Sequence, residues 1–201
     1  RHWLTAASVC GVEFMHTLLA DALRVDPDTL QSTFDMLVRS RSWLRHGEPQ
    51  TLPDGRVAVR YVFVHAVHRA VLYELAGAAG RVSLHRRLAA ALLHVHADNV
   101  ELVAAEAALH FEKGKDPAQA VQQLALAAQL ALRRFVAAEA VAISQRALDM
   151  LQALPERASL RDTELALQVT IGVAQAQRMG ITSTESRAAF KHTAGLMDDM
   201  R

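Results

Sequence analysis

The hydrophobic positions of the first forty residues repeat at helical spacing and predict three short helices. The first helix would end at Gly11, and the third would begin with Asp26 as N-cap and Pro27 at the first helical position. The apolar rows of these helices are Trp3, Leu4 and Ala7, then Met15, Leu18, Leu19, Ala22 and Leu23, then Leu30, Phe34, Leu37 and Val38.

The pattern changes to period two after the turn signal Pro53-Asp54-Gly55. Apolar residues then alternate along a predicted strand, with Arg60 on its other face, and Trp43-Leu44 would form the first arm of a hairpin around a loop over 47–55. The alternating residues are Val57, Val59, Tyr61 and Phe63. At His65 the period becomes helical again, and Val67, Val71 and Leu75 share one side. Three helices followed by a β-hairpin predict a winged-helix domain over residues 1–77.

The rest of the chain has a helical pattern throughout, so the fold class is mainly α. We predict helices over 81–96, 100–112, 117–135, 136–153, 160–179 and 184–200, which would form three hairpins. Ala128, Ala140 and Ala147 have the offsets at which a tetratricopeptide repeat (TPR) places small residues where its helices touch. The break near Phe135 contains no Gly or Pro and is inferred from this register. Residues 78–201 are therefore predicted to be TPR-like repeats, with an ordinary helical bundle as the alternative.

Composition limits the classes of partner. The chain is 51% apolar and 5% aromatic, and its net charge of +1 gives no general attraction to nucleic acid or anionic membrane. The single Cys10 fits a reducing, cytoplasmic location, and no apolar run is long enough for a transmembrane helix. The chain begins at Arg1 inside a helical pattern, which suggests an internal piece of a longer protein.

The motifs do not indicate chemistry of the chain's own. His65 and His68, His94 and His96, and His110 have no cysteine or carboxylate at ligand spacing, so no metal site is predicted. The sequence contains no Gly-x-Ser-x-Gly and no Gly-x-x-x-x-Gly-Lys-Ser/Thr. We therefore expect no catalytic residue, no bound cofactor in this chain and no enzyme activity.

DNA binding is a separate possibility for a winged helix. The segment from Arg39 to Arg69 contains six arginines and only two carboxylates, Glu48 and Asp54, so the hairpin region carries a positive net charge. The third helix opposes this, because its outward positions would include Asp28, Gln31, Ser32 and Asp35, and carboxylates repel phosphates. A hairpin that faces protein is favoured, and a DNA-binding transcriptional regulator is the alternative.

Several motifs resemble the segment that follows the nucleotide-binding domain in bacterial predicted ATPases of the STAND signalling class. These proteins are often fused to adenylate cyclase or DNA-binding regulator domains. The matching motifs are Pro53-Asp54-Gly55, Arg60-Tyr61-x-Phe63-x-His65-Ala66, Arg69, Leu72-Tyr73-Glu74, Arg81, Leu84-His85-Arg86-Arg87, His110-Phe111-Glu112-x-Gly114-x-Asp116, Glu139-Ala140 and Leu154-Pro155-Glu156. His68 and Ala70 depart from the pattern, which more often has tyrosine and a polar residue there.

The resemblance implies a division of labour. An upstream domain would bind and hydrolyse ATP, the winged helix would pack against it, and the repeats would dock a protein or peptide. It also implies that His65 contacts a phosphate of bound ADP and acts as a nucleotide sensor. The alternative for His65 is a histidine that only caps the backbone where strand meets helix. A third hypothesis is an enzyme fragment whose histidines contribute to a site completed by another domain.

Overall fold

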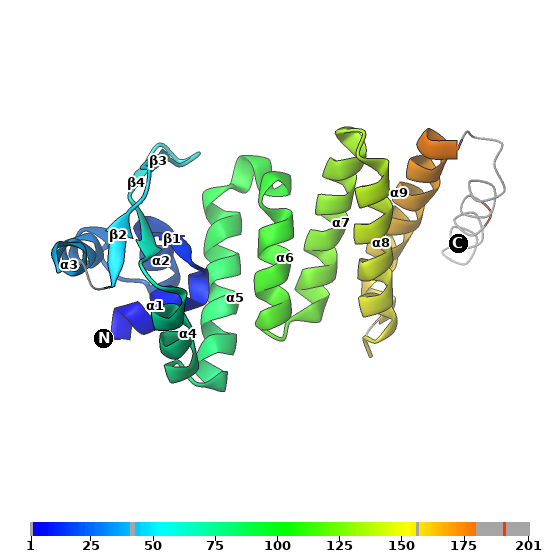
Figure 1. Ribbon diagram of the computed structural model, residues 1–201. Coiled ribbons are helices and arrows are strands. Elements are labelled where there is room, and N and C mark those ends of the chain that lie inside the picture. Colours follow the sequence, from blue (N-terminus) through cyan, green and yellow to red (C-terminus); the bar gives the residue numbers. More distant parts are fainter. Residues whose placement is uncertain (1, 41–42, 156, 180–190, 192–201) are drawn as a thin grey trace. The chain divides into compact units, whose positions relative to one another are not determined.

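The computed structural model describes residues 2–40, 43–155, 157–179 and 191 (Figure 1). This part of the chain is mainly helical with a small antiparallel sheet, as the sequence predicts. Its contacts form two compact units, Arg1–Asp98 with Lys113–Lys115 and Asn99–Glu112 with Asp116–Arg201. The boundary between a winged-helix domain that ends at residue 77 and a repeat domain that begins at residue 78 stays a prediction. By its packing, the helix Ala78–Val95 belongs to the first unit.

The first unit alternates short helices and strands before two longer helices. Its elements are α1 (His2–Cys10), β1 (Glu13–Met15), α2 (His16–Leu23), α3 (Pro27–Arg39), β2 (Leu44–His46), β3 (Gln50–Thr51), β4 (Val57–Ala58), β5 (Arg60–Phe63), α4 (Ala66–Leu75) and α5 (Ala78–Val95). The predicted N-cap of α3 is confirmed, because the Asp26 carboxylate accepts a 2.8 Å hydrogen bond from Thr29 N. α4 packs on α1, and α5 packs on α1 and α2.

The three-stranded sheet has β5 at its centre, antiparallel to β1 and to β2. In the register, Phe14 pairs with Tyr61 and Leu44 pairs with Phe63. The sequence did not predict β1, because three residues between two helices are too few to show an alternating pattern. Its addition makes β5 a central strand, which fixes Tyr61 and Phe63 from both sides.

An aromatic cluster forms the centre of this core. The Phe14 ring lies 5.2 Å from that of Phe34 and 5.7 Å from that of Phe63, and the Tyr61 ring lies 5.3 Å from Phe34. All four side chains are buried. Four of the ten aromatic residues of the chain are thus gathered between the sheet and α3, and they supply large buried areas at one place.

The hairpin differs from the prediction in two respects. The expected loop over 47–55 contains β3, which pairs with β4. The expected alternation from Val57 to Phe63 is wrong at its start, because Val57 is 63% exposed and Ala58 is fully buried. The physical cause lies at Val59, whose N–H donates to His16 Nδ1 at 3.1 Å and whose carbonyl accepts from His16 N at 3.2 Å. Val59 therefore belongs to neither strand, and the faces change there.

The second unit is entirely helical in its described part. It contains α6 (Ala104–Lys113), α7 (Pro117–Arg133), α8 (Ala137–Gln152), the short 3-10 helix η2 (Arg157–Leu160) and α9 (Arg161–Met179). A further 3-10 helix, η1 (Ala97–Leu102), occupies the start of the helix expected over 100–112, so that α6 begins four residues late. Figure 1 shows α7, α8 and α9 side by side. The helix predicted over 184–200 lies outside the described residues.

Small residues lie where these helices touch. Ala128, Ala140 and Ala147 are fully buried, as predicted for helix contacts. Ala140 belongs to a cluster with Ala131 of α7 and Ala174 of α9. A side chain with one carbon permits this close approach of three helices.

The predicted break near Phe135 is confirmed. Phe135 has φ 61° and follows the last turn of α7. Its N–H donates to the Leu132 carbonyl at 3.0 Å, and Val136 N donates to the Ala131 carbonyl at 2.9 Å. This pair of bonds is the Schellman motif, which usually has glycine at the left-handed position. A phenylalanine there explains why the sequence shows no ordinary stop signal.

Candidate functional site

His65 occupies the junction between β5 and α4. Its backbone is extended, with φ −129° and ψ 131°, and it is the N-cap residue of α4. The His65 side chain is exposed and makes no capping hydrogen bond. The alternative in which this imidazole caps the helix is therefore wrong. Instead its carbonyl accepts from His68 N at 3.1 Å and Arg69 N at 3.4 Å.

Backbone hydrogen bonds fix the residues just before His65. Phe63 N donates to the Val12 carbonyl at 2.9 Å, and Val64 N donates to the Trp43 carbonyl at 3.0 Å. The chain is thus clamped on both sides immediately ahead of the junction. An exposed imidazole on a fixed backbone is available to an external acceptor or donor, because no described residue holds a hydrogen bond to its ring.

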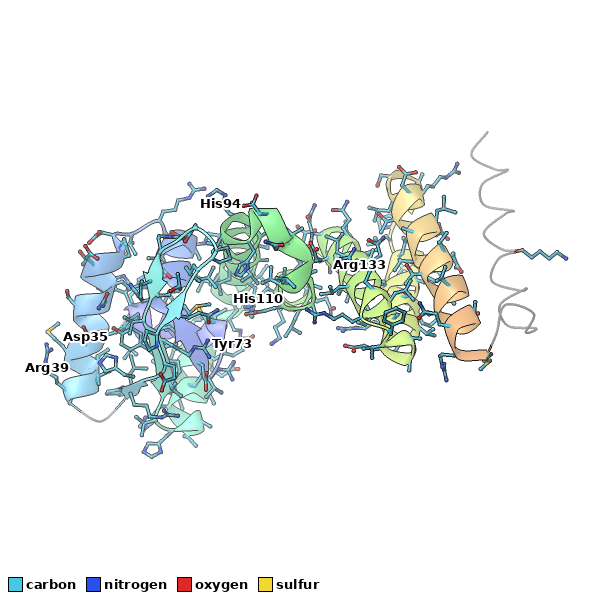
Figure 2. All side chains as sticks on the ribbon, turned by 90° about the horizontal axis from the view of Figure 1, so that it is seen from above. Asp35, Arg39, Tyr73, His94, His110 and Arg133 are labelled. Atoms are coloured by element: carbon cyan, nitrogen blue, oxygen red, sulfur yellow. The ribbon has the colours of Figure 1, made fainter. Side chains whose placement is uncertain are left out.

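The helix turn after His65 carries a second imidazole. The His65 and His68 rings meet edge to face with centroids 5.0 Å apart, and the Trp43 ring lies 4.7 Å from that of His68. His68 Nδ1 is buried without a hydrogen-bond partner among the described residues. The other histidines that the sequence singled out are not gathered here. His94 lies on α5 in the first unit, and His110 lies on α6 in the second (Figure 2). No group of three possible metal ligands occurs among the described residues.

An open pocket lies beside His68. It has a volume of about 510 Å³ and is lined by Leu4, Trp43, His68, Val71, Leu72 and Leu75. The sequence patterns do not predict this pocket. One signal was present, because α4 is apolar on two faces: Leu72 is buried, whereas Val71 and Leu75 are more than half exposed.

The motif residues of α4 and α5 form a network around Tyr73. The Arg81 guanidinium carbon lies 4.8 Å from the centre of the Tyr73 ring, and that of Arg69 lies 5.6 Å from it. Arg81 also donates to Glu74 at 2.7 Å, and the Tyr73 hydroxyl is 3.3 Å from His85 Nε2. Tyr73 can be found in Figure 2. These contacts fix α4 against α5, so Arg69, Tyr73 and Glu74 of α4 and Arg81 and His85 of α5 share a structural task.

The arginines of the hairpin are mostly occupied. Arg56 donates to Asp21 at 2.7 Å and to Asp54 at 2.8 Å, and its hydrogen bond holds the pKa of Asp54 below the ordinary value. Arg60 donates to Gln50 at 2.6 Å and lies 3.3 Å from Glu13. Paired guanidinium groups are less available to phosphates. The local positive surplus read from the sequence is therefore smaller on the folded surface.

Asp35 does not lie on the outward face of α3, which corrects the sequence interpretation. Its carboxylate accepts a 2.6 Å hydrogen bond from the Tyr61 hydroxyl and lies 3.6 Å from His46 Nε2. Burial, and next the Asp35 carboxylate, raise the pKa of Tyr61 above its ordinary value. Asp28, Ser32, Met36 and Arg39 remain exposed on α3, where Asp35 and Arg39 are labelled in Figure 2.

Compared with known proteins, the chain matches no family model, no curated protein and no solved structure. Within the described residues, no helix is long and apolar enough to cross a membrane.

Proposed function

We propose that this chain is a non-catalytic regulatory and protein-interaction segment of a larger, STAND-type ATP-dependent signalling protein. Its first part would respond to the nucleotide state of an upstream domain, and its helical hairpins would dock a protein or peptide. ATP and ADP would bind to the parent protein and not to this segment. The observation that carries the proposal is the exposed His65 imidazole on a backbone clamped at Phe63 and Val64.

The element order supports a winged helix for the first part. The sequence of elements is α1, β1, α2, α3 and β2, then the β3–β4 hairpin as the wing, and then β5, with the sheet order β1-β5-β2. In such a domain the strands support the helices and the wing as one rigid body. That rigidity suits a module that transmits a small displacement rather than absorbing it.

The packing in the second unit supports TPR-like hairpins. α8 packs on α7, and α9 packs on both. This is the contact pattern of a helix pair followed by the first helix of the next pair. Arg146 of α8 donates to both carboxylate oxygens of Glu112 at 2.6 Å, which joins α6 to the pair. Stacked hairpins of this kind present extended surfaces to partners.

The proposed mechanism assigns His65 to a phosphate oxygen of ADP in the upstream domain. A hydrogen bond to a charged acceptor would favour the ADP-bound, closed form by roughly 1–3 kcal/mol. Because the ring makes no capping bond in the chain itself, its removal should leave the stability of the fold unchanged. The ring would act only when nucleotide is present, which is the requirement for a ligand-dependent shift between two states.

The test is ADP release from the full protein that contains the upstream domain. His65→Ala should speed ADP dissociation several-fold, while His94→Ala, a change of another exposed histidine, should not. The melting temperature of the chain should be the same for both variants. An unchanged ADP off-rate in His65→Ala would reject the sensor role.

A DNA-binding regulator remains the second candidate, and one observation favours it. Asp35 is bound by Tyr61 and lies near His46, so only Asp28 of the two suspected carboxylates stays exposed on α3. The pairing of Arg56 and Arg60 argues in the other direction. Selection from random duplexes decides between them: we expect only weak binding that disappears steeply with salt, and a defined motif at physiological salt would establish the second candidate.

A further inference from the structure

The helix α5 carries positive charge and no negative charge. It contains three arginines and two histidines, and no aspartate or glutamate. Arg81 is paired with Glu74 of α4 at 2.7 Å. Arg86 and Arg87 are exposed and have no carboxylate partner among the described residues. Two adjacent guanidinium groups without a counter-ion attract anionic groups from outside the chain.

An open pocket lies along the N-terminal part of α5, and these two arginines line it. The pocket has a volume of about 510 Å³ and is lined by Ala78, Ala79, Val82, Ser83, Arg86 and Arg87. In the described part of the chain no carboxylate lines it. The small and apolar residues come first along the helix and the arginines last, so the pocket has an apolar end and a cationic end.

The turn that follows α6 holds the guanidinium of Arg86 in place. Arg86 donates to the carbonyl of Gly114 and, at 2.8 Å, to the carbonyl of Lys115. Neutral carbonyl acceptors fix a guanidinium without cancelling its charge. Lys113 and Lys115 are exposed on either side of Gly114. The cationic end of the pocket therefore contains a fixed Arg86 and an unpaired Arg87, and the adjacent turn contains two lysines.

The carboxylates next to this turn in the sequence already have partners. Glu112 accepts from Arg146 of α8 at 2.6 Å. Asp116 is the N-cap of α7 and accepts from Gln119 N at 3.3 Å. The cationic end of the pocket is thus left to attract a carboxylate of a partner.

An acidic peptide fits this pocket better than a nucleic acid or a free phosphate ion. Its apolar end offers contact to an apolar side chain, which a phosphate ion does not have. None of the described residues that line it is aromatic, so a base would have no ring to stack on. The net charge of +1 gives the chain no general attraction to polyanions. Ala78 to Arg87 spans about 14 Å of helix, which is the length of roughly four extended residues.

We propose that the α5 pocket binds a short acidic segment of a partner protein. Carboxylates of the segment face Arg86 and Arg87, and an apolar side chain of the segment covers Ala79 and Val82. This interface goes beyond the docking proposed for the hairpins of the second unit. It does not depend on the nucleotide-sensing role of His65.

The test is fluorescence anisotropy of a labelled synthetic peptide titrated with the whole chain. The peptide has about eight residues, with leucines followed by glutamates, which is enough to cover the pocket in an extended conformation. A matched peptide has glutamine in place of every glutamate. We expect the acidic peptide to bind at least roughly tenfold more tightly than the glutamine peptide at low salt, and the difference to shrink as salt is added.

Variants of the chain locate the binding. Arg87→Gln should weaken binding of the acidic peptide by roughly tenfold, because it removes a cation from the pocket. Ala79→Glu should weaken it similarly, because it places a carboxylate in the pocket, and the first turn of a helix tolerates an acidic residue. Arg45→Gln, the same change at an exposed arginine of β2, should have no effect. The melting temperatures of all three variants should equal that of the parent chain.

Several results would overturn the proposal. These are no binding of the acidic peptide, equal binding of the glutamine peptide, and equal weakening by Arg87→Gln and Arg45→Gln, which would show only a general attraction between charges. Tighter binding of a short DNA duplex than of the acidic peptide, with the same loss in Arg87→Gln, would also overturn it, because the pocket would then bind nucleic acid.

Discussion

The left-handed backbone at Phe135 gives the sharpest test of the hairpin register. Phe135 is 83% exposed and has φ 61°, so its ring contributes little while its Cβ is strained. The left-handed conformation costs an L-residue about 1–2 kcal/mol that glycine does not incur. Phe135→Gly should therefore be more stable than Phe135→Ala by about 1 kcal/mol. Comparing these two variants removes the contribution of the lost ring.

The matched control is Ala142→Gly, seven residues along and exposed in the interior of α8. The same alanine-to-glycine change there should lower stability by about 1 kcal/mol, because glycine is a poor helix former. Urea denaturation followed by circular dichroism measures both changes, and 1 kcal/mol corresponds to a midpoint shift of roughly 0.3–1 M. Tryptophan fluorescence reports on the first unit alone, because Trp3 and Trp43 both lie there. If Phe135→Gly is no more stable than Phe135→Ala, the turn is misplaced and the helix register with it.

Three further predictions concern packing, the buried tyrosine and nucleotide. Ala140→Leu should lose roughly 1–3 kcal/mol of unfolding free energy, because the larger side chain overpacks a fully buried helix contact. Ala142→Leu, on the exposed face of α8, should lose little. Equal denaturation midpoints for the two variants would show that Ala140 has room around it. Tyr61→Phe should lose about 1 kcal/mol at neutral pH, because Asp35 loses its 2.6 Å donor. Because folding raises the pKa of Tyr61, the tyrosine stabilises the fold fully at pH values below its ordinary pKa of 10.0. The stability difference between the parent chain and Tyr61→Phe should therefore fade as the pH rises above 10. A difference that stays constant in a pH series of denaturation curves would contradict this prediction. Finally, calorimetric titration of the chain with Mg²⁺ and ATP should give no heat of binding, and micromolar affinity would refute that expectation.

The sequence predicted the helices well where their ends carry ordinary signals. Asp26 with Pro27 marked the start of α3, and Asp116 with Pro117 marks the start of α7 in the same way. In both cases the carboxylate accepts a backbone hydrogen bond, from Thr29 and from Gln119. Local rules are sufficient at these positions because the bonds span only three residues.

The errors arose where residues far apart in the chain decide the structure. Val59 leaves the strand pattern because His16, 43 residues away, takes up its N–H and carbonyl. Asp35 turns inward because Tyr61 lies 26 residues away and offers a hydroxyl. Neither contact has a periodic signature, so no window of the sequence contains it. The pocket beside His68 was missed for the same reason, since Leu4 and Trp43 contribute to its lining from outside α4.

His65 was identified from its place between a strand and a helix, and that placement is confirmed. The contact to a phosphate is a proposal, because it requires a group outside this chain. What the chain itself supplies is an exposed ring on a fixed backbone. The motif residues around Tyr73 supply the support behind it by holding α4 on α5.

The central claim is that this chain responds to the nucleotide state of an upstream domain, and one calorimetric comparison tests it most directly. The chain is titrated with that domain loaded with ADP and then with a non-hydrolysable ATP analogue. We expect tighter binding to the ADP form by about 5–150-fold, and a smaller ratio for His65→Ala. Equal affinity of the parent chain for the two forms would contradict the proposed response to nucleotide state.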